Sequence, residues 1–232
     1  MKEELVSIIM PSYNTGKFIG ETINSVIDQT YINWELIIVD DCSSDNTDEI
    51  VKNIKDSRIV YLKNEKNMGA AVSRNRALRE AKGKWIAFLD SDDLWKENKL
   101  EKQIKFMKDN NYYFSYTNYS EIDENGNQNG KKITGPKRIT KTGMFNYCWP
   151  GCLTVMYNAE KIGLIQIEDI KKKINRHDVR IDKRDRKLRS RRLLIDDKGR
   201  GTWNYYRWNR KSGQCGYGNC PEEMEFYRKA IT

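Results

Sequence analysis

Acidic side chains gather where a short apolar segment ends. Asp90, Asp92 and Asp93 follow the apolar run Trp85–Leu89 and lie within four residues of one another. Three carboxylates at this spacing repel one another unless a cation or a proton intervenes. Mg²⁺ or Mn²⁺ prefers such hard oxygen ligands and keeps coordination sites for a diphosphate. The alternative interpretation is a solvated acidic loop that caps the next helix.

A second acidic pair, Asp40 and Asp41, follows the apolar run Trp34–Val39. Carboxylates accept hydrogen bonds from the NH groups of a base and from ribose hydroxyls, so the pair suits a nucleoside. The alternative is a cap for the following helix, a role that Asp41 is able to fill. Two acidic strand ends in one chain favour a binding site over two unrelated caps.

The elements that must position these residues alternate along the first half of the chain. Apolar runs predict strands over residues 5–10, 34–39, 58–62 and 85–89, and helical spacing predicts helices near 19–27, 50–54, 70–81 and 100–107. This alternation predicts an α/β fold with a mostly parallel central sheet flanked by helices. Ligands of such sheets bind at the carboxyl ends of the strands. Beyond residue 111, Tyr113–Tyr119 and Cys152–Tyr157 indicate antiparallel strands added to this sheet.

The net charge of +9 comes from the last part of the chain. Residues 171–232 hold 19 Lys and Arg against 8 Asp and Glu, and arginine replaces lysine as the more frequent basic residue. No strand or helix period persists through residues 180–220, so we expect a basic tail without regular structure. Its arginines and aromatic residues suit RNA or an anionic membrane. Translation in a shifted reading frame would also produce this composition, and we favour that interpretation.

Cysteine content and hydropathy exclude several classes of protein. The five cysteines are odd in number and poorly spaced, so we expect no disulfide framework and a cytoplasmic protein. Cys215 and Cys220 form only a lone half-site, which does not indicate zinc. No apolar run approaches the roughly 20 residues of a membrane-spanning helix.

Four sequence motifs in order resemble the family 2 glycosyltransferases of the GT-A fold: VSIIMPSYN, ELIIVDDCSSDNT, NMGAAVSRNRAL and WIAFLDSDDLW. The resemblance continues to about residue 170 and is greatest to bacterial teichuronic-acid and related cell-envelope polysaccharide glycosyltransferases. It implies a GT-A domain over residues 1–170, with a nucleotide-binding half over 1–110 and the start of an acceptor half over 111–170. Residues 171–232 depart from the family, although EFYRKAI near the end resembles its C-terminal helix.

The resemblance also implies roles for single residues. Pro11 and Tyr13 would line the nucleotide site, with Tyr13 beside the uracil, and Asp40 would contact the base. Arg74 would reach the nucleotide or its phosphates. Tyr13 as a packed aromatic residue and Arg74 as a helix-surface residue paired with a carboxylate are the alternatives.

The DxD element of the family corresponds to Asp90 and Asp92, with Asp92 as the direct ligand of Mn²⁺ or Mg²⁺. The metal would neutralise charge on the departing UDP. Family members invert the anomeric centre in a single displacement, which needs a carboxylate base. Asp178 is the candidate, with Glu168 and Asp169 as the alternative pair, although the sequence after Asp178 lacks the tryptophan and leucine helix face of the family pattern.

The function implied is metal-dependent transfer of a sugar from a UDP-sugar to a lipid-linked or growing cell-envelope glycan. We expect the protein at the cytoplasmic face of the membrane, attached peripherally at most. The alternatives are a nucleotide-sugar-binding homologue with impaired catalysis and, less favoured, a nucleic-acid-binding protein that uses the basic tail.

Overall fold

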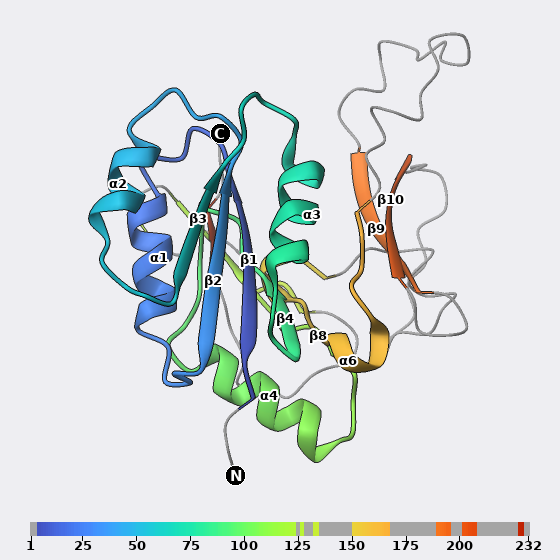
Figure 1. Cartoon of the computed structure of the whole chain (residues 1–232). Helices are drawn as coiled ribbons and strands as arrows, with labels where there is room; N and C mark the ends of the chain where they lie inside the picture. The colour runs from blue at the N-terminus through green and yellow to red at the C-terminus, as the bar shows by residue number, and fades with distance from the viewer. Residues whose placement is uncertain are drawn as a thin grey trace, which may run out of the picture.

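The computed structural model describes residues 4–123, 126–127, 132–134 and 150–167, and the backbone of strands at 189–195, 201–207 and 227–229. The central sheet has six strands in the order β3-β2-β1-β4-β8-β6. Helices cover both of its faces (Figure 1). The α/β architecture expected from the alternating sequence pattern is therefore confirmed.

Four parallel strands form the first part of this sheet: β1 (Val6–Ser12), β2 (Trp34–Asp40), β3 (Ile59–Lys63) and β4 (Trp85–Phe88). The helices that follow them are α1 (Ile19–Ile27), α2 (Thr47–Asn53), α3 (Ala70–Glu80) and α4 (Lys99–Asp109). β1, β2 and β4 are apolar along most of their length because helices cover both faces of the sheet.

Successive residues of β1 and β2 point to opposite faces of the sheet. Ile8 and Ile38 belong to the core cluster shared with α1, α2 and α4, whereas Ile9 and Ile37 belong to the cluster shared with α3. Figure 1 shows α1 and α2 on one side of the sheet and α3 on the other. The same alternation determines to which face of the sheet each side chain at a strand end points.

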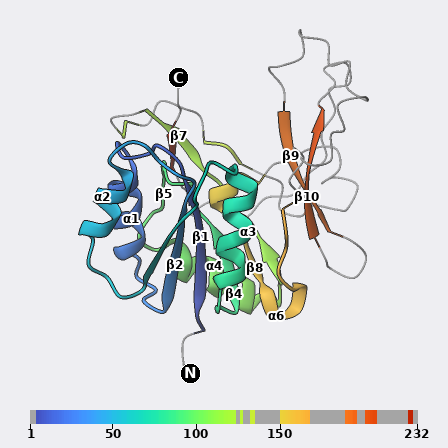
Figure 2. The same ribbon diagram turned by 45° about the horizontal axis from the view of Figure 1, so that its top comes forward.

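The carboxyl ends of β1, β2 and β3 lie level with one another, whereas β4 ends at Phe88, which pairs with Ile9. Ser12 pairs in register with Asp40, and Asp40 with Lys63. A small second sheet contains β5 (Asp93–Leu94), β11 (Tyr227–Lys229) and β7 (Ser120–Ile122), in that order. Figure 2 shows β5 and β7 at the end of the molecule where β1 and β2 finish.

The expected antiparallel strands are present beside β4. β8 (Met156–Asn158) runs antiparallel to β4 and to β6 (Phe114–Ser115), and the short helix α6 (Ala159–Ile162) follows β8. Cys152–Thr154 forms a 3₁₀ turn, η1, instead of the expected start of a strand. The Thr154 amide and hydroxyl both donate to the Gly151 carbonyl, at 3.0 and 2.7 Å, which closes the turn.

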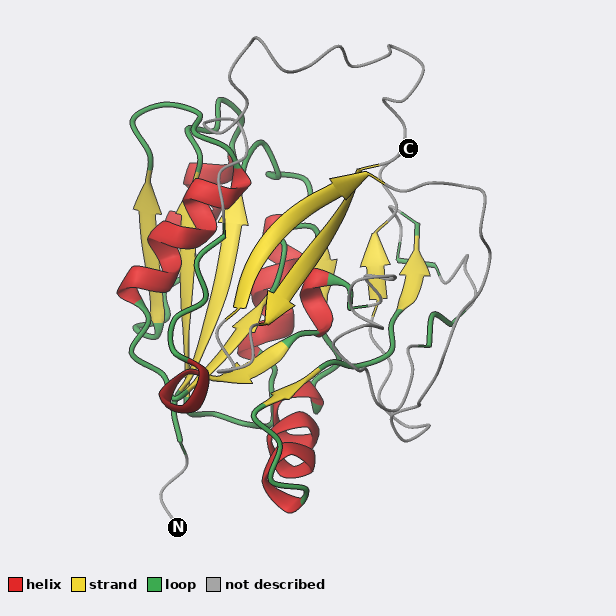
Figure 3. Cartoon of the chain, turned by 90° about the vertical axis from the view of Figure 1, so that its right-hand side faces the viewer, coloured by secondary structure: helices red, strands yellow, loops and turns green. Residues whose placement is uncertain are grey.

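The expectation of no regular structure in residues 180–220 is wrong for two segments. β9 (Arg189–Ile195) and β10 (Gly201–Arg207) pair as an antiparallel two-stranded sheet, drawn in yellow with the other strands in Figure 3. β10 contains tryptophan, tyrosine and threonine, which favour strands and outweigh the missing period. Near the C-terminus, EFYRKAI resembles the C-terminal helix of the family, but its described residues, Tyr227–Lys229, form the strand β11 between β5 and β7.

Candidate functional site

The acidic residues after β4 lie on a tight turn. The Asp93 amide donates to the Asp90 carbonyl at 3.1 Å, and the side chains of Asp90 and Asp92 are half-buried. Arg74 of α3 pairs through Nη2 with Oδ1 of Asp90, and its side chain is almost fully buried. The structure therefore brings Arg74 and Asp90 together beside Asp92, and Arg74 is not a helix-surface residue.

Thr22 and Ser25 of α1, together with Gln29 just after the end of that helix, hold the chain around and after this turn. The Thr22 hydroxyl donates to the Ser91 carbonyl at 3.1 Å in a buried hydrogen bond. Ser25 Oγ accepts from the Trp95 amide at 3.3 Å, and Gln29 Nε2 donates to the Lys96 carbonyl at 2.8 Å. A packed helix, and not the turn alone, thus fixes where Asp90 and Asp92 lie.

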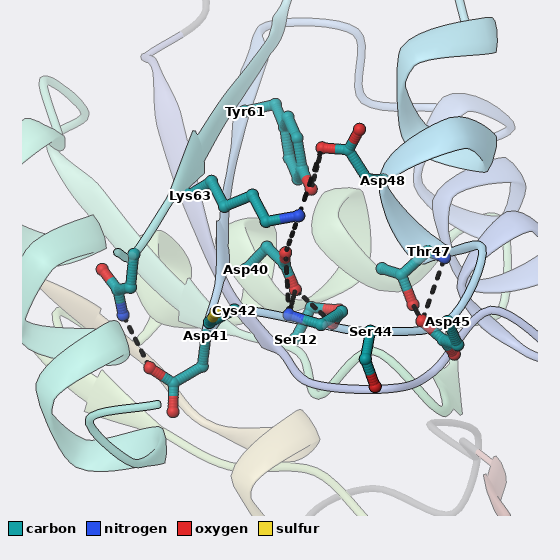
Figure 4. Close-up of polar contacts among 12 residues, drawn as sticks. Ser12, Asp40, Asp41, Cys42, Ser44, Asp45, Thr47, Asp48, Tyr61 and Lys63 are labelled. Carbon is teal, nitrogen blue, oxygen red and sulfur yellow. Dashed lines mark hydrogen bonds and ion pairs between the residues drawn. The ribbon is translucent and has the colours of Figure 1, made fainter. Parts of the chain in front are cut away.

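Asp40, at the end of β2, is fully buried on the α1 and α2 side of the sheet (Figure 4). Its carboxylate accepts from the Ser43 hydroxyl and from the Ser43 amide, and lies 3.6 Å from Nζ of Lys63. Lys63 also lies 3.9 Å from Asp48, which accepts a 3.0 Å hydrogen bond from Tyr61. Burial and these two carboxylates raise the pKa of Tyr61, so its hydroxyl stays protonated.

Asp41 points to the opposite side of the sheet from Asp40 (Figure 4). It accepts hydrogen bonds from the Asn64 side chain at 2.7 Å and from the amides of Met68 and Gly69 at 2.9 and 2.6 Å. Burial acts to raise the pKa of Asp41, but these donors hold it below its usual value. Asp41 therefore secures the loop that leads into α3, and does not fill the expected role of a cap for α2.

Tyr13 lies on the loop after β1 with 48% of its surface exposed, so it is not a packed core residue. Hydrogen bonds interlock this loop with the loop after β2. The Asn14 amide donates to Ser43 Oγ and the Gly16 amide to Asp45 Oδ2, both at 2.9 Å. Pro11, by contrast, is buried within β1.

Met68, on the loop after β3, is the second exposed apolar side chain at this edge, with 39% of its surface exposed. Met68 and Asn64 are not among the site residues predicted from the sequence. The role of Asp41 in anchoring a loop is not predicted either. The sequence did contain a signal for them. The predicted third strand ends at Leu62, whereas the observed strand continues to Lys63 and is followed by Asn64. β1, β2 and β3 therefore all end in polar residues, and β4 is followed by Asp90 after Leu89.

The candidate bases Asp178, Glu168 and Asp169 lie outside the described residues, and their roles stay predictions. The chain just before Glu168 is well fixed. The Asn75 amide group donates to the Ile167 carbonyl at 2.6 Å and accepts from the Ile167 amide at 2.7 Å. Since Asn75 follows Arg74 on α3, the segment that ends at Ile167 is tied to the helix that contacts Asp90.

No group of three His, Cys, Asp or Glu side chains suited to a metal ion occurs within the described ranges. Over the same residues, no helix has both the length and the apolar character needed to cross a bilayer.

Comparison with known proteins places this arrangement in a family. The sequence model of Glycosyl transferase family 2 matches residues 7–159. This chain belongs to that family. The sheet, the acidic turn after β4 and the structural neighbours agree with a GT-A fold.

Two curated relatives cover most of the same region. The chain is 46% identical over 169 residues to a putative teichuronic acid biosynthesis glycosyltransferase of Bacillus subtilis, covering 72% of this chain and 67% of that protein. It is 52% identical over 156 residues to the Escherichia coli UDP-Glc:alpha-D-GlcNAc-diphosphoundecaprenol beta-1,3-glucosyltransferase, covering 67% of this chain and 61% of that protein. The chain thus spans about two thirds of the length of these relatives.

Among solved structures, S. aureus TarS 1–349 in complex with UDP matches with a TM-score of 0.54 and 27% identity. The match covers 66% of this chain and 46% of TarS 1–349.

Proposed function

We propose that the protein transfers a sugar from a UDP-sugar to a lipid-linked or growing cell-envelope glycan, with inversion in a single displacement. The observation that carries the proposal is the turn of Asp90 and Asp92 beside the buried Arg74, at the edge where parallel strands bind ligands. The donor and acceptor classes are supported by the E. coli relative, whose name specifies UDP-Glc and a diphosphoundecaprenol, and by TarS, which was crystallised with UDP.

The donor nucleotide would lie across the carboxyl edge of the sheet. Tyr13 and Met68 offer exposed apolar surface there, and Asp41 lies between their two loops. Asp40 stays a predicted base contact, but its full burial means that Ser43 or Lys63 would have to move first. Arg74 supplies positive charge where the phosphates would lie.

Asp90 and Asp92 fit a divalent cation. Mg²⁺ is usually bound by one or two carboxylates together with substrate phosphates, so a pair of carboxylates on one turn is a sufficient protein contribution. Mn²⁺ prefers the same oxygen ligands. When bound, the ion would neutralise charge on the departing diphosphate.

The chemical step needs a base from the acceptor half. The acceptor hydroxyl oxygen would bond to the anomeric carbon while the bond to the UDP oxygen breaks, and the base would take the hydroxyl proton. Asp178 is the proposed base, with Glu168 and Asp169 as the alternative. Because the acceptor of the E. coli relative is lipid-linked, we propose a peripheral association with the cytoplasmic membrane.

The test is a thermal-shift titration with UDP and a panel of UDP-sugars, with and without Mn²⁺, on the wild type and Asp92→Asn. Ligand at 100 times its Kd stabilises the native state by about 2.7 kcal/mol. We expect stabilisation that depends on Mn²⁺ and is lost in the variant. If no nucleotide stabilises the wild type, the proposed donor site is wrong.

A second candidate is a nucleotide-sugar-binding homologue without transfer activity. It is favoured by residues 171–232, whose basic composition departs from the rest of the chain and which include the proposed base. Transfer activity that is present in the wild type and lost in Asp178→Asn would exclude this candidate.

A further inference from the structure

Asn64 occupies a central position between the strand ends and α3. It is 4% exposed and directly follows β3. Its amide nitrogen donates to Asp41 Oδ1 at 2.7 Å and to Ser73 Oγ at 3.0 Å. One side chain thus joins the end of β2 to the first turns of α3.

Arg76 determines which way the Asn64 amide points. Nη1 of Arg76 donates to Asn64 Oδ1 at 2.7 Å and to the Lys63 carbonyl at 2.9 Å. An arginine only donates, so the Asn64 oxygen must face Arg76 and the NH₂ group must face Asp41. In the reversed orientation, the amide oxygen would face the Asp41 carboxylate and repel it.

Asp41 in turn positions the loop before α3. Its two oxygens hold the amides of Met68 and Gly69, and Gly69 has a φ of 91°, which favours glycine. Met68 presents 39% of its surface at this point. The orientation of Asp41 therefore decides where the Met68 side chain and the adjacent backbone lie.

We propose that Asn64, oriented by Arg76, is a positioning residue for the nucleoside end of the donor site. It fixes Asp41 and, through Asp41, the Met68–Gly69 backbone that borders the base. This inference rests on the proposed use of a UDP-sugar. The diphosphate end depends on different residues, because Arg74 and Asp90 pair with each other and Thr22 of α1 holds the Ser91 carbonyl in the acidic turn.

The experiment measures nucleoside and diphosphate binding separately. Isothermal titration of the full chain with Mn²⁺ gives Kd values for UDP, CDP and pyrophosphate. The variants are Asn64→Leu and Arg76→Met, and the matched control is Arg79→Met, an exposed arginine on the same helix. Losing a hydrogen bond to a charged group weakens binding about tenfold or more.

We expect both variants to weaken UDP binding about tenfold and to reduce the preference for UDP over CDP, with the Kd for pyrophosphate unchanged. Equal weakening of UDP and pyrophosphate would show a general structural role and overturn the proposal. If both variants bind UDP with the same Kd as the control Arg79→Met, the proposal is also overturned.

If Asn64→Leu does not fold, Arg76→Met decides, since Arg76 is only partly buried. A wild-type chain that binds none of these ligands would refute the proposed function itself, which is a distinct result from unchanged binding in the variants.

Discussion

Lys99 is fully buried at the start of α4, and its Nζ has no hydrogen-bond partner. The amine lies 3.7 Å from the ring centroid of Trp95, a contact that stabilises only the protonated form. Burial lowers the pKa of Lys99 well below its ordinary value. In the unfolded chain, this amine keeps its proton up to about pH 10.4. Because the proton binds more tightly to the unfolded chain than to the folded protein, the native state is destabilised at neutral pH.

We predict that Lys99→Met raises the free energy of unfolding by about 2 kcal/mol at pH 7, because a buried amine without a partner is replaced by an apolar chain of similar shape. The folded-state pKa is depressed, so the wild type gains stability as the pH rises toward 10 and the difference between the two proteins shrinks. Urea unfolding at pH 7 and pH 10 measures this. Equal stability of the two proteins at pH 7 would contradict the prediction.

Gly16 shows how closely the loops after β1 and β2 approach. A Cβ at this position would lie 2.0 Å from Oδ1 of Asn46 and 3.1 Å from Oδ2 of Asp45. We predict that Gly16→Ala lowers the free energy of unfolding, measured by urea unfolding, by about 0.5–1.5 kcal/mol, because the exposed Asn46 side chain must leave its present conformation to make room. The control is Gly20→Ala, because the atom nearest to the added Cβ lies 3.5 Å away, at an ordinary contact distance. Gly126→Ala is less suitable, because Gly126 has a φ of 82° that strains any other residue.

At the scale of elements, α3 combines several positioning contacts within four consecutive residues. Ser73 and Arg76 contact Asn64, Arg74 pairs with Asp90, and Asn75 holds Ile167. These partners come from the segments after β3, β4 and β8. A shift of α3 would therefore move Asn64, the acidic turn and the segment of Ile167 together.

α1 supports the acidic turn from the other side of the sheet. We predict that Thr22→Val, which removes the hydrogen bond to the Ser91 carbonyl but keeps the shape, costs about 1–2 kcal/mol of stability and raises the Mn²⁺ concentration needed for UDP binding. The control is Thr30→Val, which removes an exposed hydroxyl contact to Glu101. The measurement is a Mn²⁺ titration at fixed UDP, and an equal Mn²⁺ requirement in both variants would contradict it.

The sequence predicts the elements better than the contacts between them. Apolar runs located the four parallel strands to within two residues, and the acidic turn followed from Asp90 and its neighbours. The opposite directions of Asp40 and Asp41 also follow from the alternation of a strand. The bond between Asn75 and Ile167 could not be predicted, because it joins residues 92 positions apart through a side chain with no distinctive pattern.

At the scale of the whole molecule, an ion network secures the end of the sheet opposite the site. Glu4 lies 2.5 Å from Lys84 and 2.9 Å from Lys108, and accepts a 3.0 Å hydrogen bond from Trp85. Lys84 also lies 3.6 Å from Glu160 of α6. Burial acts to raise the pKa of Glu4, but the two lysines and Trp85 outweigh it and lower this pKa to about 2.

We predict that Glu4→Gln lowers stability at pH 7 by about 1 kcal/mol, a small value because the pair is partly exposed and solvent screens it. The folded-state pKa is depressed, so the stabilisation is complete above about pH 4.5 and is lost as the pH falls toward 2. Between pH 7 and pH 2, the free energy of unfolding should therefore fall less steeply in Glu4→Gln than in Glu49→Gln, a control at an exposed residue. Identical acid profiles would contradict the prediction.

The two hydrogen bonds between the Asn75 side chain and the Ile167 backbone have a consequence for the order of folding. The strands β1, β2 and β3 and their helices make contacts between segments close in sequence, which form early. The segment of Ile165 and Ile167 packs on the α3 face and joins Asn75 only after a loop of 92 residues has closed, which is entropically slow. We therefore expect the parallel strands and their helices to assemble first and the segment of Ile165 and Ile167 to dock onto the α3 face as a late step.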